Sequence, residues 1–324
     1  MKKLLIFCFG ITLGIFVAVN TLGLMMGEFI YRELTSPHLY QNLFNLQDNS
    51  KNIEKIASAE KKYEWEKVGL TSPHGYTIRG TYIPAKQPSN QTILFLHGLF
   101  QNRSSGLDYL DIYQEMGYNV LIVDARGHGD SGGGSISWGY FEKDDINVWL
   151  SWLEQKTPQG IIGIHGISMG AATALLHSEL NESTHRVSFY IADSSYDDFK
   201  DLLIKQLTIL AGLPEDSKAL HIILFYTEIA AYYHDRFTFD QISPLLAVKY
   251  TTTPVLYLHG QKDTLIPPQM SQDLYSATAG AKELHFFPDT SHASAVYYDK
   301  TTYAETIRAF IEKIRKNKNG KVQF

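Results

Sequence analysis

Hydrophobic and polar positions divide the chain into a long uncharged segment at the N-terminus and a succession of short elements after it. Residues 4–27 contain no charged side chain, whereas Lys2 and Lys3 precede them and Glu28 follows them. A helix of this length measures about 36 Å, which is enough to cross the hydrocarbon core of a bilayer with some tilt. The pattern predicts a transmembrane anchor over residues 1–27.

A cleaved secretory signal is the alternative interpretation of this segment. The apolar region of such a signal usually has only about 7–15 residues, and Ala18-Val19-Asn20 is a poor match to the cleavage pattern that should follow it. We therefore favour a retained, single-pass anchor. Because two lysines precede the span and only Arg32 soon follows it, the positive-inside rule predicts a cytoplasmic N-terminus and an extracytoplasmic main domain.

The rest of the chain alternates between strand-like and helix-like patterns. Residues 28–62 are predicted to form a juxtamembrane connector, and residues 63–324 are predicted to form an α/β domain. Strand-like runs lie at residues 67–71, 77–83, 92–96, 119–123, 160–165, 187–192, 254–259 and 284–287. Helical periodicity lies at residues 104–116, 141–154, 169–180, 268–279 and 302–316.

The eight runs are predicted to form one sheet. A short turn at residues 72–75 joins the first two as a hairpin, and the later runs are continuously apolar, as expected of parallel strands buried on both faces. The order predicts an eight-stranded, mostly parallel, doubly wound α/β sheet. Two apolar helical patterns, at residues 199–213 and 219–233, predict a helical cap over about residues 197–250. Extra core packing or membrane contact is the alternative for this insertion.

One motif points to a specific chemistry. Gly166-Ile167-Ser168-Met169-Gly170 lies between a predicted strand and a predicted helix, which is the context of a nucleophile elbow. The tight turn needs glycine two residues to either side of the serine, and the helix start favours developing negative charge. Gly129-Asp130-Ser131-Gly132-Gly133 has the same spacing, but Gly134 follows it and no helix can begin there. We therefore predict that Ser168 is the nucleophile and that Ser131 is a loop residue.

A nucleophilic serine needs a base and an acid that orients the base. Asp263 follows the run at residues 254–259 and His292 follows the last run, at the carboxyl ends of strands where the sites of open α/β sheets collect. We predict that His292 takes the proton of Ser168 and that Asp263 holds the imidazole tautomer. Asp193 also ends a strand and is the alternative acid. The oxyanion hole is predicted to consist of the backbone N–H groups of Met169 and Leu99.

These motifs carry a resemblance to a known family. His97-Gly98, the stretch Asp124-Ala125-Arg126-Gly127-His128-Gly129-Asp130-Ser131, the serine elbow, Asp263 and His292 occur in this order. The arrangement resembles the α/β-hydrolase superfamily over about residues 65–315, and is similar to bacterial serine hydrolases of the serine aminopeptidase and monoglyceride-lipase-like kind. The resemblance implies the α/β-hydrolase fold, with the stretch at residues 124–131 as a structural loop. No metal-ligand spacing or phosphate-binding loop occurs, so neither a metal nor a cofactor is predicted.

The predicted function is a serine hydrolase that cleaves carboxylic esters, with short-to-medium or lipid-like acyl groups, through an acyl-enzyme. An aminopeptidase or thioesterase using the same triad is one alternative, and a binding module without chemistry is another. A net charge of −5 without a basic stripe argues against nucleic acid as a partner. Apolar side chains of the insertion are predicted to line the pocket for an uncharged ester presented near the membrane: Leu203, Leu207, Leu210, Ile223, Phe225, Tyr232 and Tyr233.

Overall fold

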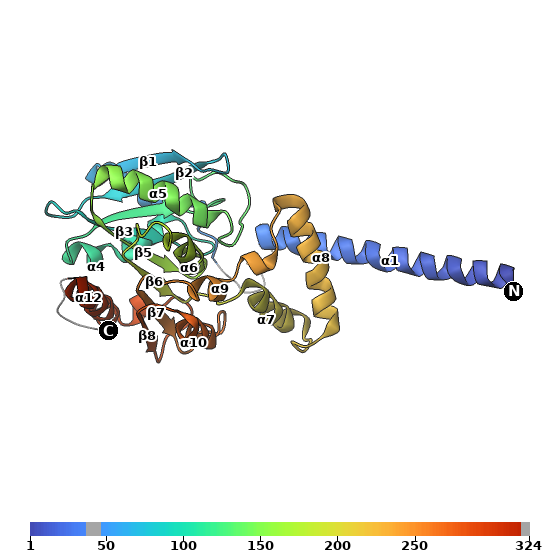
Figure 1. The fold of residues 1–324 in the computed structure, drawn as a ribbon. Helices are drawn as coiled ribbons and strands as arrows, with labels where there is room; N and C mark the ends of the chain where they lie inside the picture. Colours follow the sequence, from blue (N-terminus) through green and yellow to red (C-terminus); the bar gives the residue numbers. More distant parts are fainter. Residues whose placement is uncertain (37–46, 319–324) are drawn as a thin grey trace. The chain divides into compact units, whose positions relative to one another are not determined.

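The computed structural model describes residues 1–36 and 47–318, and the chain divides into two compact units. The larger unit, Leu46–Phe199 with Ile242–Phe324, holds the sheet and its helices. The smaller unit, Met1–Asn45 with Lys200–Gln241, holds the N-terminal helix and the insertion (Figure 1).

The larger unit is built on one eight-stranded sheet with the order β1-β2-β4-β3-β5-β6-β7-β8. Strands β1 and β2 pair antiparallel, β2 pairs antiparallel with β4, and the remaining pairs are parallel. The predicted fold class is thus confirmed. The strands are β1 Glu66–Thr71, β2 Thr77–Ile83, β3 Gln91–Leu96, β4 Asn119–Asp124, β5 Ile161–Ile167, β6 Phe189–Asp193, β7 Val255–Gly260 and β8 Lys282–Phe287.

Helices cover both faces of this sheet. Every residue of β4, β6 and β7 is buried, because parallel strands of a doubly wound sheet are covered on both sides. One core cluster joins the strands to α3 Glu54–Tyr63, α4 Leu110–Glu115, α11 Ala295–Tyr298 and α12 Lys300–Lys318. The other joins them to α5 Glu142–Lys156, α6 Met169–Asn181, α9 Pro244–Val248 and α10 Pro268–Ala277.

Some helices differ from the sequence prediction. The helix predicted over residues 104–116 is broken: a 3₁₀ segment, η1 Arg103–Asp108, precedes α4, and the two meet at Tyr109. The Asn102 side chain accepts a hydrogen bond from the Ser104 N–H and so starts η1 in the tighter winding. Helices α9 and α11 were not predicted, because elements this short show no helical periodicity.

Helix α3 belongs to the larger unit, although it lies in the predicted connector. Its Ile56 is fully buried in the core beside α4 and α12. Glu60, on the same helix, is buried and pairs with Arg103 across 3.2 Å. The packed domain therefore begins well before residue 63.

The smaller unit consists of α1 Lys2–Thr35, α8 Lys218–Asp235 and most of α7 Phe199–Ala211, with the short η2 Phe239–Gln241 after them. Helix α1 continues beyond Gly27 as far as Thr35, and residues 1–18 of the chain are exposed. Farther along, α1 packs against α8 where Gly23 and Gly27 face Tyr226. A Cβ at Gly27 would collide with the Tyr226 backbone, so glycine allows the two helices to approach closely.

Candidate active site

Ser168 lies at the turn between β5 and α6 in a strained backbone conformation. Its φ is 54° and its ψ is −117°, a region that residues with a Cβ rarely adopt. A Cβ at Gly166 would collide with the backbone of Gly170, and a Cβ at Gly170 would collide with the carbonyl of Leu96. Both glycines of the motif are therefore required by close backbone contacts, as expected for a serine elbow.

The structure brings Ser168, His292 and Asp263 together in one hydrogen-bonded row. Ser168 Oγ lies 2.9 Å from His292 Nε2, and His292 Nδ1 lies 2.7 Å from Asp263 Oδ2. The three side chains come from the turn after β5, the loop after β7 and the loop after β8. With its proton on Nδ1, His292 donates to Asp263 and presents an unprotonated Nε2 to the serine hydroxyl.

Asp263 is held as a carboxylate by its partners. The N–H groups of Leu265 and Ile266 each donate to Asp263 Oδ1 across 2.9 Å. Burial acts to raise the pKa of the Asp263 carboxyl, but hydrogen bonds with His259 and His292 outweigh it and hold this pKa well below its usual range. Asp263 therefore remains negatively charged where it faces the imidazole.

His259 is a neighbour of the site that sequence reasoning did not assign. It is fully buried on β7, and its Nε2 lies 3.1 Å from Asp263 Oδ2 and 2.9 Å from the Ile266 carbonyl oxygen. Its Nδ1 lies 2.7 Å from Ser271 Oγ. The spacing of four residues between His259 and Asp263 is the only sequence signal of this contact.

Asp193, the alternative acid, has different partners. Its carboxylate accepts hydrogen bonds from Tyr303 Oη across 2.7 Å and from Ser194 Oγ across 2.8 Å, and its backbone carbonyl accepts the Ser168 N–H across 2.8 Å. Burial raises the pKa of the Asp193 carboxyl despite these hydrogen bonds. Ser194 Oγ also accepts the N–H of Ala293, beside His292. Asp193 thus supports the elbow and, through Ser194, the histidine loop.

The two predicted oxyanion donors lie on the segments that surround Ser168. A Cβ at Gly98 would stand only 3.3 Å from Ser168 Cβ, so the loop that carries Leu99 passes close to the nucleophile. Met169 is the first residue of α6. Within the described parts of the chain, neither the Leu99 N–H nor the Met169 N–H has a hydrogen-bond acceptor. The lack of an internal acceptor is what the predicted role of these two amides requires.

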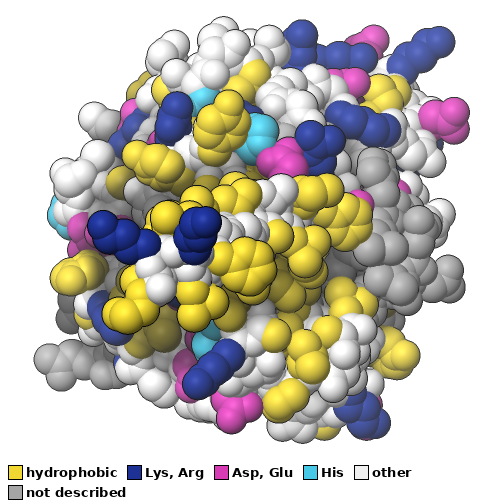
Figure 2. Space-filling view, turned by 90° about the vertical axis from the view of Figure 1, so that its right-hand side faces the viewer, with side chains coloured by type: hydrophobic (Ala, Val, Ile, Leu, Met, Phe, Trp, Pro, Cys, Tyr) yellow, Lys and Arg dark blue, Asp and Glu magenta, His cyan; other side chains and the backbone are white. Residues whose placement is uncertain are grey.

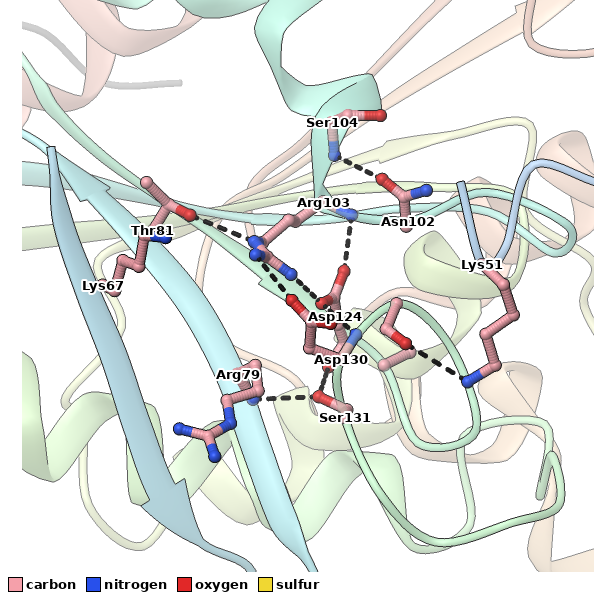
Figure 3. A network of polar contacts seen from close by, with 12 residues as sticks. Lys51, Lys67, Arg79, Thr81, Asn102, Arg103, Ser104, Asp124, Asp130 and Ser131 are labelled. Carbon is pink, nitrogen blue, oxygen red and sulfur yellow. Dashed lines mark hydrogen bonds and ion pairs between the residues drawn. The ribbon is translucent and has the colours of Figure 1, made fainter. Parts of the chain in front are cut away.

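A buried ionic network follows the loop that carries Leu99, which we call the oxyanion loop after the role predicted for Leu99 (Figure 3). Arg103, just after that loop, pairs with Asp124 on β4, with Asp130 across 3.0 Å and with Glu60 on α3. Its backbone N–H donates to Asp124 Oδ1 across 2.8 Å. Buried charges are retained when paired in this way, and the network ties three segments of the chain together.

The second serine motif belongs to this structural loop, as predicted. Ser131 Oγ donates to the Asp124 carbonyl across 2.8 Å and accepts the Arg79 N–H across 2.9 Å (Figure 3). His128 is buried and its ring contacts His97, and burial lowers the pKa of both imidazoles to about 4. In the described part of the chain, none of these side chains forms a hydrogen bond or ion pair with Ser168, His292 or Asp263. Within the described residues, no group of three His, Cys, Asp or Glu side chains is placed to hold a metal ion.

Comparisons with known proteins agree with this architecture. A family model described as the alpha/beta hydrolase fold matches residues 91–220. Protein YqkD of Bacillus subtilis is 32% identical over 96% of this chain and 98% of its own length. The zebrafish (Danio rerio) lysophosphatidylserine lipase ABHD12 is 24% identical over 88% of this chain and 74% of its own length.

Solved structures are similar in fold at low sequence identity. The Pyrococcus furiosus esterase Pf2001 has a TM-score of 0.62 and 22% identity, covering 78% of this chain and 93% of that one. An esterase from Exiguobacterium antarcticum has a TM-score of 0.55 and 20% identity, covering 76% and 100%. The fold and these relatives together support a hydrolase activity. The chain belongs to the α/β-hydrolase family.

Proposed function

We propose that this protein is a membrane-anchored serine hydrolase that cleaves carboxylic esters through an acyl-enzyme. The observation that carries the proposal is the row in which Ser168 Oγ lies 2.9 Å from His292 Nε2 and His292 Nδ1 lies 2.7 Å from Asp263 Oδ2. Nucleophile, base and orienting acid need this order and this spacing to act as a unit.

In the first half of the reaction, Ser168 Oγ attacks the ester carbonyl carbon while its proton moves to His292 Nε2. The carbonyl π electrons move to the oxygen, and this oxyanion accepts hydrogen bonds from the Leu99 and Met169 N–H groups. Asp263 stabilises the imidazolium that forms. When the tetrahedral intermediate collapses, the bond to the alcohol oxygen breaks and His292 gives its proton to the leaving alkoxide.

In the second half of the reaction, water replaces the alcohol. His292 Nε2 takes a proton from the water as its oxygen attacks the acyl carbon, and the same two N–H groups hold the second oxyanion. Collapse then breaks the bond to Ser168 Oγ, which recovers the proton from His292. The products are one alcohol and one carboxylic acid, and the enzyme returns to its starting state.

The substrate class rests on several observations. ABHD12 of zebrafish is named as a lysophosphatidylserine lipase and Pf2001 as an esterase, which favours an ester with a lipid-like or short-to-medium acyl chain. Helix α1 has the length and composition of a membrane-spanning helix, and we propose that it anchors the enzyme with its N-terminus in the cytoplasm. An anchored enzyme would meet its ester in or near the bilayer.

Labelling with a fluorophosphonate probe tests the chemistry directly. An activated serine displaces fluoride from the probe and becomes covalently phosphonylated. The wild-type chain should be labelled, Ser168→Ala should not be, and Ser131→Ala, which alters the second serine motif, should be labelled like wild type. Ester turnover at the wild-type rate by a folded Ser168→Ala protein would overturn the proposal.

A substrate panel tests the ester class separately. Each added methylene buried in an apolar pocket contributes about 0.8 kcal/mol, so kcat/KM on p-nitrophenyl esters should rise a few-fold per methylene until the pocket is filled. A flat profile from acetate to octanoate would contradict the proposed acyl specificity. A clear preference for aminoacyl amides or acyl thioesters would replace it with one of the other predicted activities.

A further inference from the structure

Helix α8 has an apolar face that remains uncovered. Phe225 is 59% exposed, Ile222 56% and Tyr233 71%. These residues and Ile229 recur with the spacing that places them on one side of a helix. The opposite side of α8, with Leu220, Leu224, Thr227, Ala230 and Ala231, is buried. The sequence placed Phe225 and Tyr233 on the wall of a substrate pocket, but both rings are exposed.

Contacts with α1 show which way this face points. The two helices approach closely where Gly27 meets Tyr226, and Figure 1 shows that α8 crosses α1 instead of running alongside it. From that crossing, Tyr226 Oη reaches back to donate to Asn20 Oδ1 across 2.8 Å. Asn20 lies seven residues before Gly27, which corresponds to about 10 Å along the axis of α1. Tyr226 therefore points toward the uncharged N-terminal part of α1.

The exposed residues surround Tyr226 on that same side of α8. Ile222 and Ile229 lie one turn before and after it, and Tyr233 lies two turns after it. On the other side, His234 Nε2 lies 2.9 Å from Glu28 Oε2, and Asp235 accepts a hydrogen bond from Tyr31 Oη. Apolar side chains thus face the uncharged part of α1, and polar side chains pair with its charged end.

The charged residues of α8 lie outside its apolar face. Lys218 and Arg236 bracket the apolar face at its two ends, whereas Glu228 is engaged elsewhere and accepts the Phe239 N–H across 2.9 Å. Figure 2 looks along α1 from its N-terminal end and shows hydrophobic side chains gathered across the middle of the view. Aromatic and aliphatic residues flanked by basic ones are typical of helices that lie in the membrane interface.

We propose that the face of α8 formed by Ile222, Phe225, Ile229 and Tyr233 lies in the headgroup region of the same bilayer that α1 crosses. The proposal rests on the membrane anchoring put forward under the proposed function. Because α8 crosses α1, a spanning α1 holds α8 near the membrane plane, and the uncharged surface continues from one helix to the other. The protein then has two membrane contacts, one that spans and one that lies on the surface.

The test uses full-length protein in vesicles of phosphatidylcholine and phosphatidylglycerol. Cys8 is the only cysteine, so Cys8→Ser gives a background in which single cysteines carry an environment-sensitive fluorophore. Phe225→Cys reports on α8 and Val17→Cys reports on the anchor. Tyr250→Cys, an exposed tyrosine of the larger unit, is the matched aqueous reference. Each probe is exposed to a lipid with a nitroxide at the headgroup, to a lipid with a nitroxide deep in the acyl chain, which reaches the middle of the span where Val17 lies, and separately to iodide in the water.

The expected result is that the headgroup nitroxide quenches the Phe225→Cys probe about threefold or more beyond the Tyr250→Cys probe, that iodide shows the reverse order, and that the deep nitroxide quenches the Val17→Cys probe. Quenching of Val17→Cys without quenching of Phe225→Cys would leave the anchor in place and overturn the surface contact. If neither probe is quenched by lipid, the proposed anchor fails and the surface contact fails with it. Protection of Phe225→Cys from both quenchers, increasing with protein density, would assign this face to a second copy of the chain.

A functional readout accompanies the fluorescence. Ile222→Glu introduces a charge into the proposed contact at a residue outside the predicted pocket lining, and its turnover of an ester embedded in vesicles should fall about tenfold, whereas turnover of water-soluble p-nitrophenyl acetate should not change. Tyr250→Glu is the matched control and should change neither rate. Equal rates for Ile222→Glu and wild type on the embedded ester would contradict the contact, whether or not Ser168→Ala is inactive.

Discussion

At the scale of single residues, two buried aspartates lie near Ser168, and their hydrogen-bond partners assign them different tasks. Asp263 faces the imidazole of His292, whereas Asp193 is occupied by Tyr303 and Ser194 and receives the Ser168 N–H on its backbone carbonyl. A buried carboxylate stays with the groups that donate hydrogen bonds to it, because leaving it without them costs free energy. The sequence placed both aspartates at strand ends, but it contained no information on where either side chain points.

The first prediction separates the two aspartates. Asp263→Asn should lower turnover by about 10⁴-fold, because an amide can no longer hold the imidazole in the required tautomer or stabilise the imidazolium. Asp193→Asn should mainly lower the stability of the fold and should change turnover far less. Steady-state kinetics with thermal melting of both variants provide the measurement. A crippled Asp193→Asn beside a mildly affected Asp263→Asn would reverse the assignment.

A second prediction concerns His165, which packs beneath the elbow. Its ring nitrogens lie 2.6 Å from Tyr113 Oη and 3.1 Å from Tyr303 Oη, and burial lowers its pKa to about 3. The unfolded chain therefore binds a proton at this histidine below about pH 6.5 while the folded chain does not. The resulting contribution to the free energy of unfolding is complete above that pH and is lost as the pH falls toward 3.

The measurement is the free energy of unfolding by urea for wild type and His165→Gln. The difference between the two should shrink by roughly 2–3 kcal/mol from about pH 8 to about pH 4.5, because only the wild type must protonate this histidine on unfolding. His177→Gln should behave in the same way, since burial also lowers the pKa of His177 to about 3. A pH-independent difference would show that His165 takes up its proton at the same pH in the folded and in the unfolded chain.

At the scale of elements, the sequence predicted the sheet far better than its connections. Long apolar runs place each strand, because a strand buried on both faces leaves few positions for polar residues. The break of the helix at Tyr109 and the contact between His259 and Asp263 depend on side chains brought together by the sheet. The buried position of α3 could not be predicted for the same reason. Glutamate is usually exposed, and only the structure shows that Glu60 pairs with Arg103.

Residues of the predicted connector also form hydrogen bonds that fix the oxyanion loop in place. Asn102 is buried, and its amide donates to the carbonyls of Asn49 and Asn52 across 2.6 and 2.9 Å. The Asn49 N–H in turn donates to the Phe100 carbonyl across 2.8 Å, and Phe100 has a φ of 61°. These contacts fix a strained loop whose Leu99 N–H is a proposed oxyanion donor. Asn102 is in this sense a positioning residue.

Asn102→Ala should accordingly lower kcat about 10- to 100-fold with little change in KM. The reason is that a poorly positioned Leu99 N–H stabilises the transition state less while affecting substrate binding little. The matched control is Asn181→Ala, which removes another buried asparagine that bonds to Val187 and Thr253 away from the loop. It should lower the melting temperature without lowering kcat. If both variants lose stability and keep full kcat, the connector does not position the oxyanion loop.

At the scale of the whole molecule, the pairing of α1 with α8 joins segments that lie far apart in sequence. Tyr226 and Asn20 are 206 residues apart and are joined by a hydrogen bond. The uncharged residues 4–27 predicted a membrane helix. No local pattern indicated that Gly23 and Gly27 would meet the insertion. Pairings of this kind depend on complementary shapes and not on local preference.

This pairing bears on whether the N-terminal segment is retained. Cleavage near residue 27 would remove Gly23 and Gly27 from the packed face of α8 and expose Thr227, which is buried against Gly27. We therefore expect mature protein purified from membranes to have the mass of the intact chain and to stay in the membrane fraction through high-salt and carbonate washes.

Gly27→Leu should separate the helices, because its side chain has no room against the Tyr226 backbone, and should make α8 more sensitive to limited proteolysis. Alanine at the exposed Gly14, where nothing lies within 4 Å of an added Cβ, is the control that should change neither property. Recovery of a form that lacks the first 27 residues would favour a cleaved signal and would require α8 to cover its buried face in another way.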